Sequence, residues 1–410
     1  MPTRVTRLIV APVFTLTIAC QSAATNQETG GAEPGLNQDK AKEELVLGAE
    51  QFGNYVPLIK NDTIALVVNQ TSRVDNTHLV DTLLSQGIAI KHIFAPEHGF
   101  RGDAADGEKV KDGRDTRTGL PIISLYGNNR KPQPDQLKGI ETVIFDIQDV
   151  GTRFYTYIST MHLVMEACAG AGVRVIVLDR PNPNGDYIDG PVREDKWKSF
   201  VGMHPIPAVH GSTVGELACM INGEGWLETT DTCRLNIITM QNYHHQRPYQ
   251  LPVKPSPNLP NQQAIRLYPS LCLFEGTMIS IGRGTDFPFQ TWGYPNPAFA
   301  QTDSFQFKPV KIPGVSNYPP HQDKTCYGAD LRNVPPPGRF SLEYLLTAYQ
   351  IAKDNGLSDD FFNSYFSKLA GTATLQQQIE AGEDKETIRE SWQPGLQAYR
   401  EMRKQYLLYP

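Results

Sequence analysis

The sequence lacks an excess of basic residues, and it lacks the short motifs of nucleotide sites. Its 38 Lys and Arg residues are outnumbered by 44 Asp and Glu residues, which gives a net charge of −6. A nucleic-acid partner needs a basic face that neutralises phosphates, so this composition argues against one. No Gly-x-Gly-x-x-Gly follows an expected strand and no Walker-type loop occurs, which removes the main support for a nucleotide site. We therefore expect no nucleic-acid partner and no cofactor.

Metal-binding spacings are absent as well. The nine histidines form no His-Glu-x-x-His pattern and the six cysteines form no Cys-x-x-Cys pair, so we expect no metal site. Besides Cys20 the chain has five cysteines. This odd number argues against a complete disulfide framework and favours buried thiols. A single disulfide between Cys219 and Cys233 is the alternative. No Gly-x-Ser-x-Gly elbow surrounds Ser212, which argues against a serine nucleophile.

The N-terminus has the pattern of an export signal. Arg4 and Arg7 precede a short apolar run at 8–19, and a small residue stands directly before Cys20, as in bacterial lipoprotein signals. A plain signal peptide with an incidental cysteine is the alternative. We expect residues 1–42 to be a signal peptide followed by a flexible tether. On this reading Cys20 carries the lipid, and this lipid is the only attachment of the protein to a membrane. The expected location is the cell envelope.

Apolar, β-branched runs alternate with helical patterns over residues 43–205. Strands are expected at 63–68, 89–94, 121–126, 142–147 and 174–179, and helices at 78–86 and 157–169. This alternation predicts a mostly parallel, Rossmann-like sheet covered by helices. Less regular elements follow: a helix at 214–222, strands at 234–240 and 278–281, a proline-rich loop at 253–269, and C-terminal helices between 342 and 406. We predict an α/β protein, with a Rossmann-like domain at 43–205 and a smaller α+β auxiliary domain at 206–410.

Polar side chains follow three of the predicted strands, at the edge where an open α/β sheet binds its ligands. They include Glu97, His98, Arg101, Asp146, Asp149, Arg153, Tyr155, Tyr157 and Asn182. Each one by itself has an ordinary explanation as a turn cap or a member of an ion pair. Three such clusters at one sheet edge favour a functional site.

Glu97 is the strongest candidate for a proton donor. Phe94, Pro96 and Phe100 flank it in the sequence, and apolar surroundings favour the protonated carboxyl group that a general acid needs. At the same turn, His98 is a candidate for positioning or substrate contact. Further candidate substrate contacts are Arg101, Arg153, Tyr157, Asn182, His210, Glu275, Arg283 and Asp286.

Several motifs, in this order, are similar to those of the exo-acting β-N-acetylmuramidases of bacteria, glycoside hydrolase family 171. They lie at 96–102, 146–157, 179–183, 210–217, 256–258, 273–277 and 282–285. The resemblance covers residues 45–408. It implies a cleft between two domains that releases terminal N-acetylmuramic acid from the non-reducing ends of peptidoglycan fragments. It also places the family's motif glutamate at Glu97.

The chemistry of that substrate distributes the remaining roles. Glycoside hydrolysis usually needs an acid at the leaving oxygen and a second group at the anomeric centre. Candidates for the second group are Asp146, Asp149, Glu275, Tyr155 and the substrate's own acetamido oxygen. The lactyl carboxylate of muramic acid suits a bidentate guanidinium, with Arg153, Arg283 and Arg101 as candidates. Two alternatives remain: a non-catalytic protein that binds peptidoglycan fragments, and an amide or ester hydrolase acting on the same material.

Overall fold

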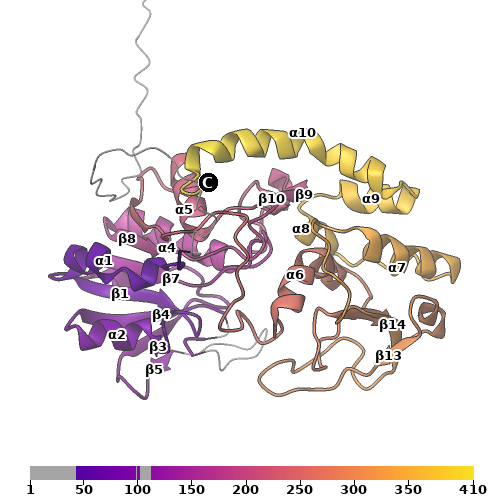
Figure 1. Cartoon of the computed structure of the whole chain (residues 1–410), viewed down its shortest axis with the longest axis horizontal. Helices are drawn as coiled ribbons and strands as arrows, with labels where there is room; N and C mark the ends of the chain where they lie inside the picture. The colour runs from indigo at the N-terminus through magenta and orange to yellow at the C-terminus, as the bar shows by residue number, and fades with distance from the viewer. Residues whose placement is uncertain (1–42, 98, 102–111) are drawn as a thin grey trace, which may run out of the picture.

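The computed structural model describes residues 43–97, 99–101 and 112–410, so the predictions for residues 1–42, including Cys20, and for His98 lie outside the described residues. Two domains lie side by side (Figure 1), a sheet domain that begins in indigo and an auxiliary domain in orange and gold. Helix α10 (Lys385–Arg403) runs along the top of both. Within the described ranges, no helix has the length and apolar character needed to cross a membrane.

The sheet domain is built on seven strands in the order β11-β8-β7-β1-β4-β6-β5. The strands are β1 (Thr63–Val68), β4 (Ala89–Ala95), β5 (Gly113–Arg114), β6 (Pro121–Ser124), β7 (Thr142–Asp146), β8 (Arg174–Leu178) and β11 (Arg234–Ile238). Neighbouring strands are parallel except β5, which pairs antiparallel with β6. The prediction of a mostly parallel, Rossmann-like sheet is confirmed.

Helices cover both faces of this sheet. They are α1 (Phe52–Ile59), α2 (Leu79–Ser85), α3 (Pro134–Leu137), α4 (Tyr157–Ala171) and α5 (Val214–Gly223). Ala65 and Val67 of β1 pack into the core under α4 and α5, whereas Ile64, Leu66 and Val68 pack into the core under α1 and α2. Successive side chains of a strand point to opposite faces, so a continuous apolar run is what a strand between two helical layers requires.

The auxiliary domain combines a small antiparallel sheet, in the order β12-β14-β13, with helices. Its elements are α6 (Gln262–Leu271), β12 (Thr291–Tyr294), β13 (Phe305–Phe307), β14 (Cys326–Asp330), α7 (Glu343–Asp354), α8 (Phe366–Ala370) and α9 (Thr374–Ala381). The α+β prediction for this part is confirmed. One hydrophobic core continues from the sheet through this domain to α10, so the two domains share buried apolar surface.

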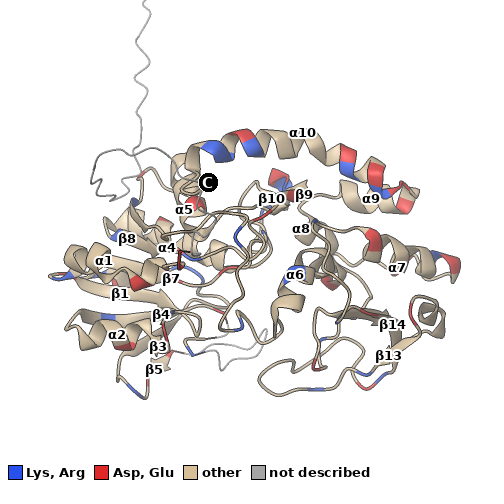
Figure 2. Cartoon of the chain, in the orientation of Figure 1, with Lys and Arg blue, Asp and Glu red and all other residues tan. Residues whose placement is uncertain are grey.

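Between the domains lies a two-stranded ribbon of β9 (Asp189–Val192) and β10 (Pro207–Val209). Helix α10 packs against β9, and no wide space separates them, since a Cβ at Gly395 would lie 3.2 Å from Val192. Charged residues of both signs are distributed along α7 and α10 (Figure 2). This mixture agrees with the modest net charge of the chain.

The predicted domain boundary after residue 205 falls inside the sheet domain. β11, which we assigned to the auxiliary domain, pairs in parallel with β8 and extends the large sheet. A strand adopts the sheet whose edge it meets, and its position in the sequence does not reveal that edge. The short strand expected at 278–281 is reduced to a single bridge between Ser280 and Gly293.

The proline-rich stretch at 253–269 is not all loop, because α6 begins at Gln262. The Asn261 side chain caps this helix by accepting a hydrogen bond from the Ala264 amide (2.9 Å). Pro269 lies within the helix and cannot donate to the Ile265 carbonyl. That carbonyl instead accepts a hydrogen bond from the Asn184 side chain (3.2 Å), a tertiary contact that lets the helix continue.

Candidate active site

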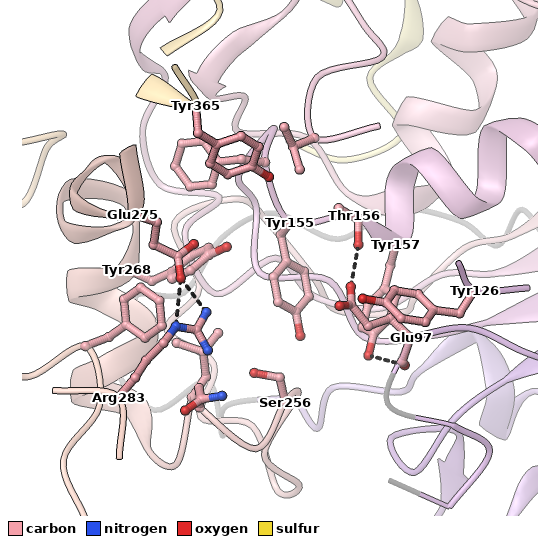
Figure 3. Close-up of a pocket in the computed structure, with 15 residues that line it drawn as sticks. Glu97, Tyr126, Tyr155, Thr156, Tyr157, Ser256, Tyr268, Glu275, Arg283 and Tyr365 are labelled. Carbon is pink, nitrogen blue, oxygen red and sulfur yellow. Dashed lines mark hydrogen bonds and ion pairs between the residues drawn. The ribbon is translucent and has the colours of Figure 1, made fainter. Parts of the chain in front are cut away.

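A pocket of about 400 Å³ lies between the two domains. Figure 3 shows its walls, with Glu97 on one side, Glu275 and Arg283 on the other, and Tyr155 between them. The side chains that line it are Glu97, Tyr126, Phe154, Tyr155, Thr156, Tyr157, Val201, Ser256, Asn258, Leu259, Tyr268, Glu275, Arg283, Phe289 and Tyr365. We call this cavity the cleft pocket.

Glu97 reaches the cleft pocket because β4 ends at Ala95, at the carboxyl edge of the sheet. The Thr156 hydroxyl donates a hydrogen bond to Glu97 Oε2 (3.2 Å), and the Tyr157 hydroxyl bonds the Glu97 carbonyl oxygen (3.4 Å). The apolar neighbours expected from the sequence, Phe94 and Phe100, pack into the two cores of the sheet domain instead. The carboxyl group therefore faces hydroxyl groups in the pocket.

Tyr155 is buried, and its ring stands between the two walls (Figure 3). Its hydroxyl has no hydrogen-bond partner among the described residues, although the hydroxyl group of Ser256 lies close enough to oppose the rise of its pKa. Burial raises the pKa of Tyr155 well above its ordinary value, and the charges of Tyr157, Asp149 and Glu97 add to this. The phenol is therefore protonated, so it suits a hydrogen-bond donor better than an attacking nucleophile.

Glu275 and Arg283 form an ion pair on the auxiliary wall. Glu275 lies in the single-turn helix Cys272–Gly276, and its Oε1 accepts hydrogen bonds from Nε (2.7 Å) and Nη2 of Arg283. The guanidinium also lies over the ring of Phe289, 5.2 Å from its centroid. Among the described residues that line the cleft pocket, Arg283 is the only Lys or Arg. Both predicted contacts are thus in the pocket.

Two predicted site residues are engaged in ion pairs away from the cleft pocket. Asp146 is fully buried and holds Arg180 in a bidentate pair, with Arg180 Nη2 2.9 Å from Asp146 Oδ2. Arg101 forms a bidentate pair with Asp115 (3.0 and 2.8 Å). The structure therefore does not support Asp146 as a catalytic group or Arg101 as a substrate contact, because each is held by an opposite charge elsewhere.

Arg153 is fully buried and does not face the cleft pocket. Its guanidinium donates to the main-chain oxygens of Pro191, Ile206, Leu369 and Ala370, at 2.7 to 2.8 Å. The prediction that Arg153 binds the lactyl carboxylate is therefore wrong for this conformation, because protein carbonyls occupy both terminal nitrogens.

Asp149, His210 and Asn182 are buried and do not line the cleft pocket. Asp149 Oδ1 accepts the Gly151 amide hydrogen bond (2.7 Å), while His210 Nε2 lies 3.9 Å away. Burial raises the pKa of Asp149 to about 7 and lowers the pKa of His210 to about 3. The Asn182 side chain donates to the Ser212 carbonyl (2.9 Å). These three predicted site residues thus contact main-chain groups or one another and do not contact the pocket interior.

Asp286 is exposed and does not line the cleft pocket, so its role as a substrate contact stays a prediction. Tyr157, by contrast, lines the pocket as predicted. Tyr268 lines the pocket, whereas Trp292 is buried and stacks on Phe274 with ring centroids 5.9 Å apart.

Sequence reasoning missed Tyr126, Thr156 and Tyr365 as pocket residues. Thr156 lies within the motif at 146–157, so its polar side chain next to Tyr155 was an available signal. Tyr126 and Tyr365 had none, because each comes from an irregular segment and reaches the pocket only through tertiary packing.

Over the described ranges, no group of three or more His, Cys, Asp or Glu side chains has an arrangement that could hold a metal ion. The described cysteines, Cys168, Cys219, Cys233, Cys272 and Cys326, are buried free thiols, so Cys219 and Cys233 are not joined. The chemistry of the pocket therefore rests on its carboxyl, phenol, hydroxyl and guanidinium groups.

An α/β sheet domain and an auxiliary domain enclose carboxyl groups on opposite walls, with phenols between them, and this arrangement suits a glycoside hydrolase, which uses carboxyl groups on both sides of the scissile bond. Comparison with known families identifies which one. The exo-beta-N-acetylmuramidase NamZ N-terminal domain matches residues 64–263, and the NamZ C-terminal domain matches residues 266–409. The chain belongs to this family.

Individual relatives agree with this assignment. The chain is 37% identical over 398 residues to the peptidoglycan beta-N-acetylmuramidase NamZ of Bacillus subtilis (strain 168), which covers 91% of this chain and 93% of the relative. Crystal structures of two DUF1343 family proteins from Bacteroides fragilis NCTC 9343 are similar to it. One has a TM-score of 0.81 and 44% identity, covering 90% of this chain and 99% of its own. The other has a TM-score of 0.78 and 28% identity, covering 89% and 99%.

Proposed function

We propose that this glycoside hydrolase releases N-acetylmuramic acid from the non-reducing ends of peptidoglycan fragments, with Glu97 as the general acid. The observation that carries the proposal is the position of the Glu97 carboxyl group, which faces the cleft pocket with the Thr156 hydroxyl at 3.2 Å. A relative of 37% identity is named for the same activity on peptidoglycan.

The size of the cleft pocket favours exo action. Its volume of about 400 Å³ falls near the lower end of the range for small-molecule sites, about 300–1,000 Å³. A pocket of this size accommodates a terminal sugar unit, whereas cleavage within a glycan strand needs a long open groove. The rest of the fragment then extends outward from the scissile bond.

In the proposed reaction, Glu97 donates its proton to the glycosidic oxygen as the bond to the anomeric carbon breaks. A water molecule supplies the hydroxyl group that this carbon gains, either directly or after the second group has bonded to it. The Thr156 hydroxyl holds the carboxyl group in position. Of the protein candidates for the second group, Glu275 lines the pocket, while Asp146 and Asp149 do not. Glu275 and the substrate's acetamido oxygen are therefore the two candidates that the geometry supports. Tyr155 contributes as a neutral donor to the sugar.

Arg283 is the proposed contact for the lactyl carboxylate. It is a guanidinium on the pocket wall, and two parallel hydrogen bonds to a carboxylate are the geometry that guanidinium groups favour. Glu275 holds this side chain through Nε and Nη2, which limits its rotamers before the substrate arrives. N-acetylglucosamine has no lactyl carboxylate, so this contact distinguishes the two amino sugars.

Glu97→Gln tests the catalytic assignment. With a chromogenic β-N-acetylmuraminide, we expect a loss of turnover on the order of 10²–10⁴-fold and nearly unchanged binding of N-acetylmuramic acid by calorimetry. Glu380→Gln, which removes an exposed carboxylate on α9, is the matched control and should keep the wild-type rate. Near-normal turnover of Glu97→Gln would show that another group is the acid. Tight binding by the wild type without aglycone release would support a binding protein, and release of amide or ester groups alone would support the other alternative.

Arg283→Ala tests lactyl recognition. We expect the ratio of kcat/KM for the muraminide over the matching N-acetylglucosaminide to fall on the order of 10–100-fold, as for a lost charge-assisted hydrogen bond. Arg247→Ala, at a partly exposed arginine outside the cleft pocket, is the control. An unchanged ratio in Arg283→Ala would remove this residue from substrate recognition.

The cell-envelope location is part of the same proposal and rests on residues 1–42, with Cys20 as the lipid-bearing residue. Growth of producing bacteria with an alkyne-labelled fatty acid, followed by coupling to a dye, should label the wild-type protein and not Cys20→Ser. Equal labelling of both proteins would contradict lipidation at Cys20.

A further inference from the structure

The guanidinium of Arg153 joins the two domains. Two of its acceptors, the carbonyls of Pro191 and Ile206, belong to the region of the β9–β10 ribbon (2.7 and 2.8 Å). The other two, the carbonyls of Leu369 and Ala370, belong to the last turn of α8 (2.8 and 2.7 Å). One buried side chain thus ties the auxiliary helix α8 to the segment that leaves the large sheet.

Burying a cation costs free energy unless its hydrogen bonds are satisfied, so the four carbonyl acceptors are needed to keep Arg153 in this position. Burial lowers the pKa of Arg153 to about 9, so the group stays charged at neutral pH. The carbonyls at a helix C-terminus lack partners within the helix and favour a nearby cation. Gly371, with φ 76°, leaves the space that the guanidinium needs, since a Cβ there would lie 2.7 Å from Arg153 Nη2.

On the sheet side, the residues directly after Arg153 form one wall of the cleft pocket. Phe154, Tyr155, Thr156 and Tyr157 all line it, and Thr156 bonds the Glu97 carboxyl group. The Arg153 amide also donates to the Ala208 carbonyl (2.9 Å). Arg153 therefore makes both contacts: its main chain anchors the segment that forms this wall, and its side chain reaches α8.

On the auxiliary side, α8 is locked to the turn that carries Glu275. The Asn363 amide donates to the Gly276 carbonyl (2.9 Å), and a Cβ at Gly276 would lie only 2.4 Å from the Phe366 Cα. Glu275 in turn holds Arg283. A displacement of α8 therefore moves the Glu275–Arg283 pair as well as Tyr365, the pocket residue directly before α8.

We propose that Arg153 is a positioning residue that sets the separation between the Glu97–Tyr155 wall and the Glu275–Arg283 wall, and thereby the selectivity for N-acetylmuramic acid. The inference rests on the proposed function of the cleft pocket. It adds a residue that fixes the distance between the two walls of that pocket. Arg153 acts through main-chain carbonyls and has no contact with the sugar. Loss of the side chain should loosen the auxiliary wall without removing any pocket group.

The test is Arg153→Ala with chemical rescue. We expect the muraminide-to-glucosaminide ratio of kcat/KM to fall on the order of 10–100-fold, the scale for a catalytic geometry misplaced by about 1 Å. Added guanidinium ion, at concentrations far below denaturation, should restore the ratio, and urea at equal concentration should not. Arg266→Ala is the matched control, since Arg266 is a partly buried arginine that donates to the Pro183 carbonyl and to Asp186 and not to α8.

Gly371→Ala keeps the test valid if Arg153→Ala does not fold. Its Cβ would lie 2.7 Å from Arg153 Nη2 and 2.9 Å from Arg193 Cα, at φ 76°. The added methyl group displaces the guanidinium while the charge remains, so it should lower the same ratio. An unchanged ratio of kcat/KM in the folded variants would overturn the inference. A variant that loses thermal stability, is not rescued by guanidinium and keeps normal selectivity would overturn it as well. Failure of the proposed function itself looks different, because the wild type would then release no N-acetylmuramic acid at all.

Discussion

Asp149→Asn should stabilise the protein at neutral and alkaline pH while leaving it unchanged in acid. Asp149 is buried, with Oδ1 bonded to the Gly151 amide (2.7 Å) and no hydrogen-bond partner for Oδ2 among the described residues. His210 Nε2 is 3.9 Å from Oδ1, and the low pKa of His210 leaves that ring neutral. Among the residues that the structure describes, no cation therefore compensates the Asp149 carboxylate. An asparagine has the same shape and still accepts the Gly151 bond.

Burial raises the pKa of Asp149 from 3.8 to about 7. The folded state then binds the proton more tightly than the unfolded state between these two pH values, so stability falls as the pH rises through this window. Each pH unit corresponds to about 1.4 kcal/mol. Between pH 5 and pH 8, the free energy of unfolding of Asp149→Asn should thus rise by about 3 kcal/mol relative to that of the wild type. Most of this rise should occur below pH 7.

Urea unfolding of both proteins at several pH values measures this difference. Comparison of the two proteins cancels the titration of groups that they share, including the buried Asp179, whose pKa burial raises to about 6. Asp286→Asn, an exposed substitution, should run parallel to the wild type. A difference between Asp149→Asn and the wild type that does not change with pH would refute the argument that burial of this carboxyl group costs stability when it ionises.

Two further substitutions test buried contacts outside the cleft pocket. Asp146→Asn removes one member of a buried bidentate pair and leaves Arg180 with an uncompensated charge, so we expect a loss of about 3–5 kcal/mol in urea unfolding; a loss below 1 kcal/mol would contradict this. Gly151→Ala places a Cβ 2.0 Å from Asn182 Oδ1 at φ 82°. Strain and overpacking should cost about 1–3 kcal/mol each, and calorimetry that shows an unchanged Tm would exclude the clash.

Local sequence patterns predicted the sheet domain well where burial on both faces dictates the residues. The run Thr63–Val68 is β1 to the residue, and the helix expected at 214–222 is α5 with one more residue. The local sequence pattern did not predict the helix where a contact with a residue distant in the sequence decides the local structure. α6 continues through Pro269 because Asn184, far away in the sequence, satisfies the carbonyl that the proline leaves without a donor.

The candidate site divides in the same way. Glu97 was predictable because a parallel strand must end at the ligand-binding edge of the sheet. Arg153 and Arg283 are both arginines in family-like motifs, yet only Arg283 lines the cleft pocket. The choice depends on the carbonyls of Leu369 and Ala370, which lie more than 200 residues further along the chain and bond Arg153. No local pattern contains that information.

By itself, the sequence determined the alternation of strands and helices, the layered fold and the presence of an acid at the end of β4, because burial and backbone geometry act on neighbouring residues. Only the tertiary structure decided which polar groups face the substrate. A charged group buried in the folded chain must find its partner wherever the packing provides one. Asp146 finds Arg180 and Arg153 finds the end of α8, and Glu97, Tyr155, Glu275 and Arg283 remain around the pocket.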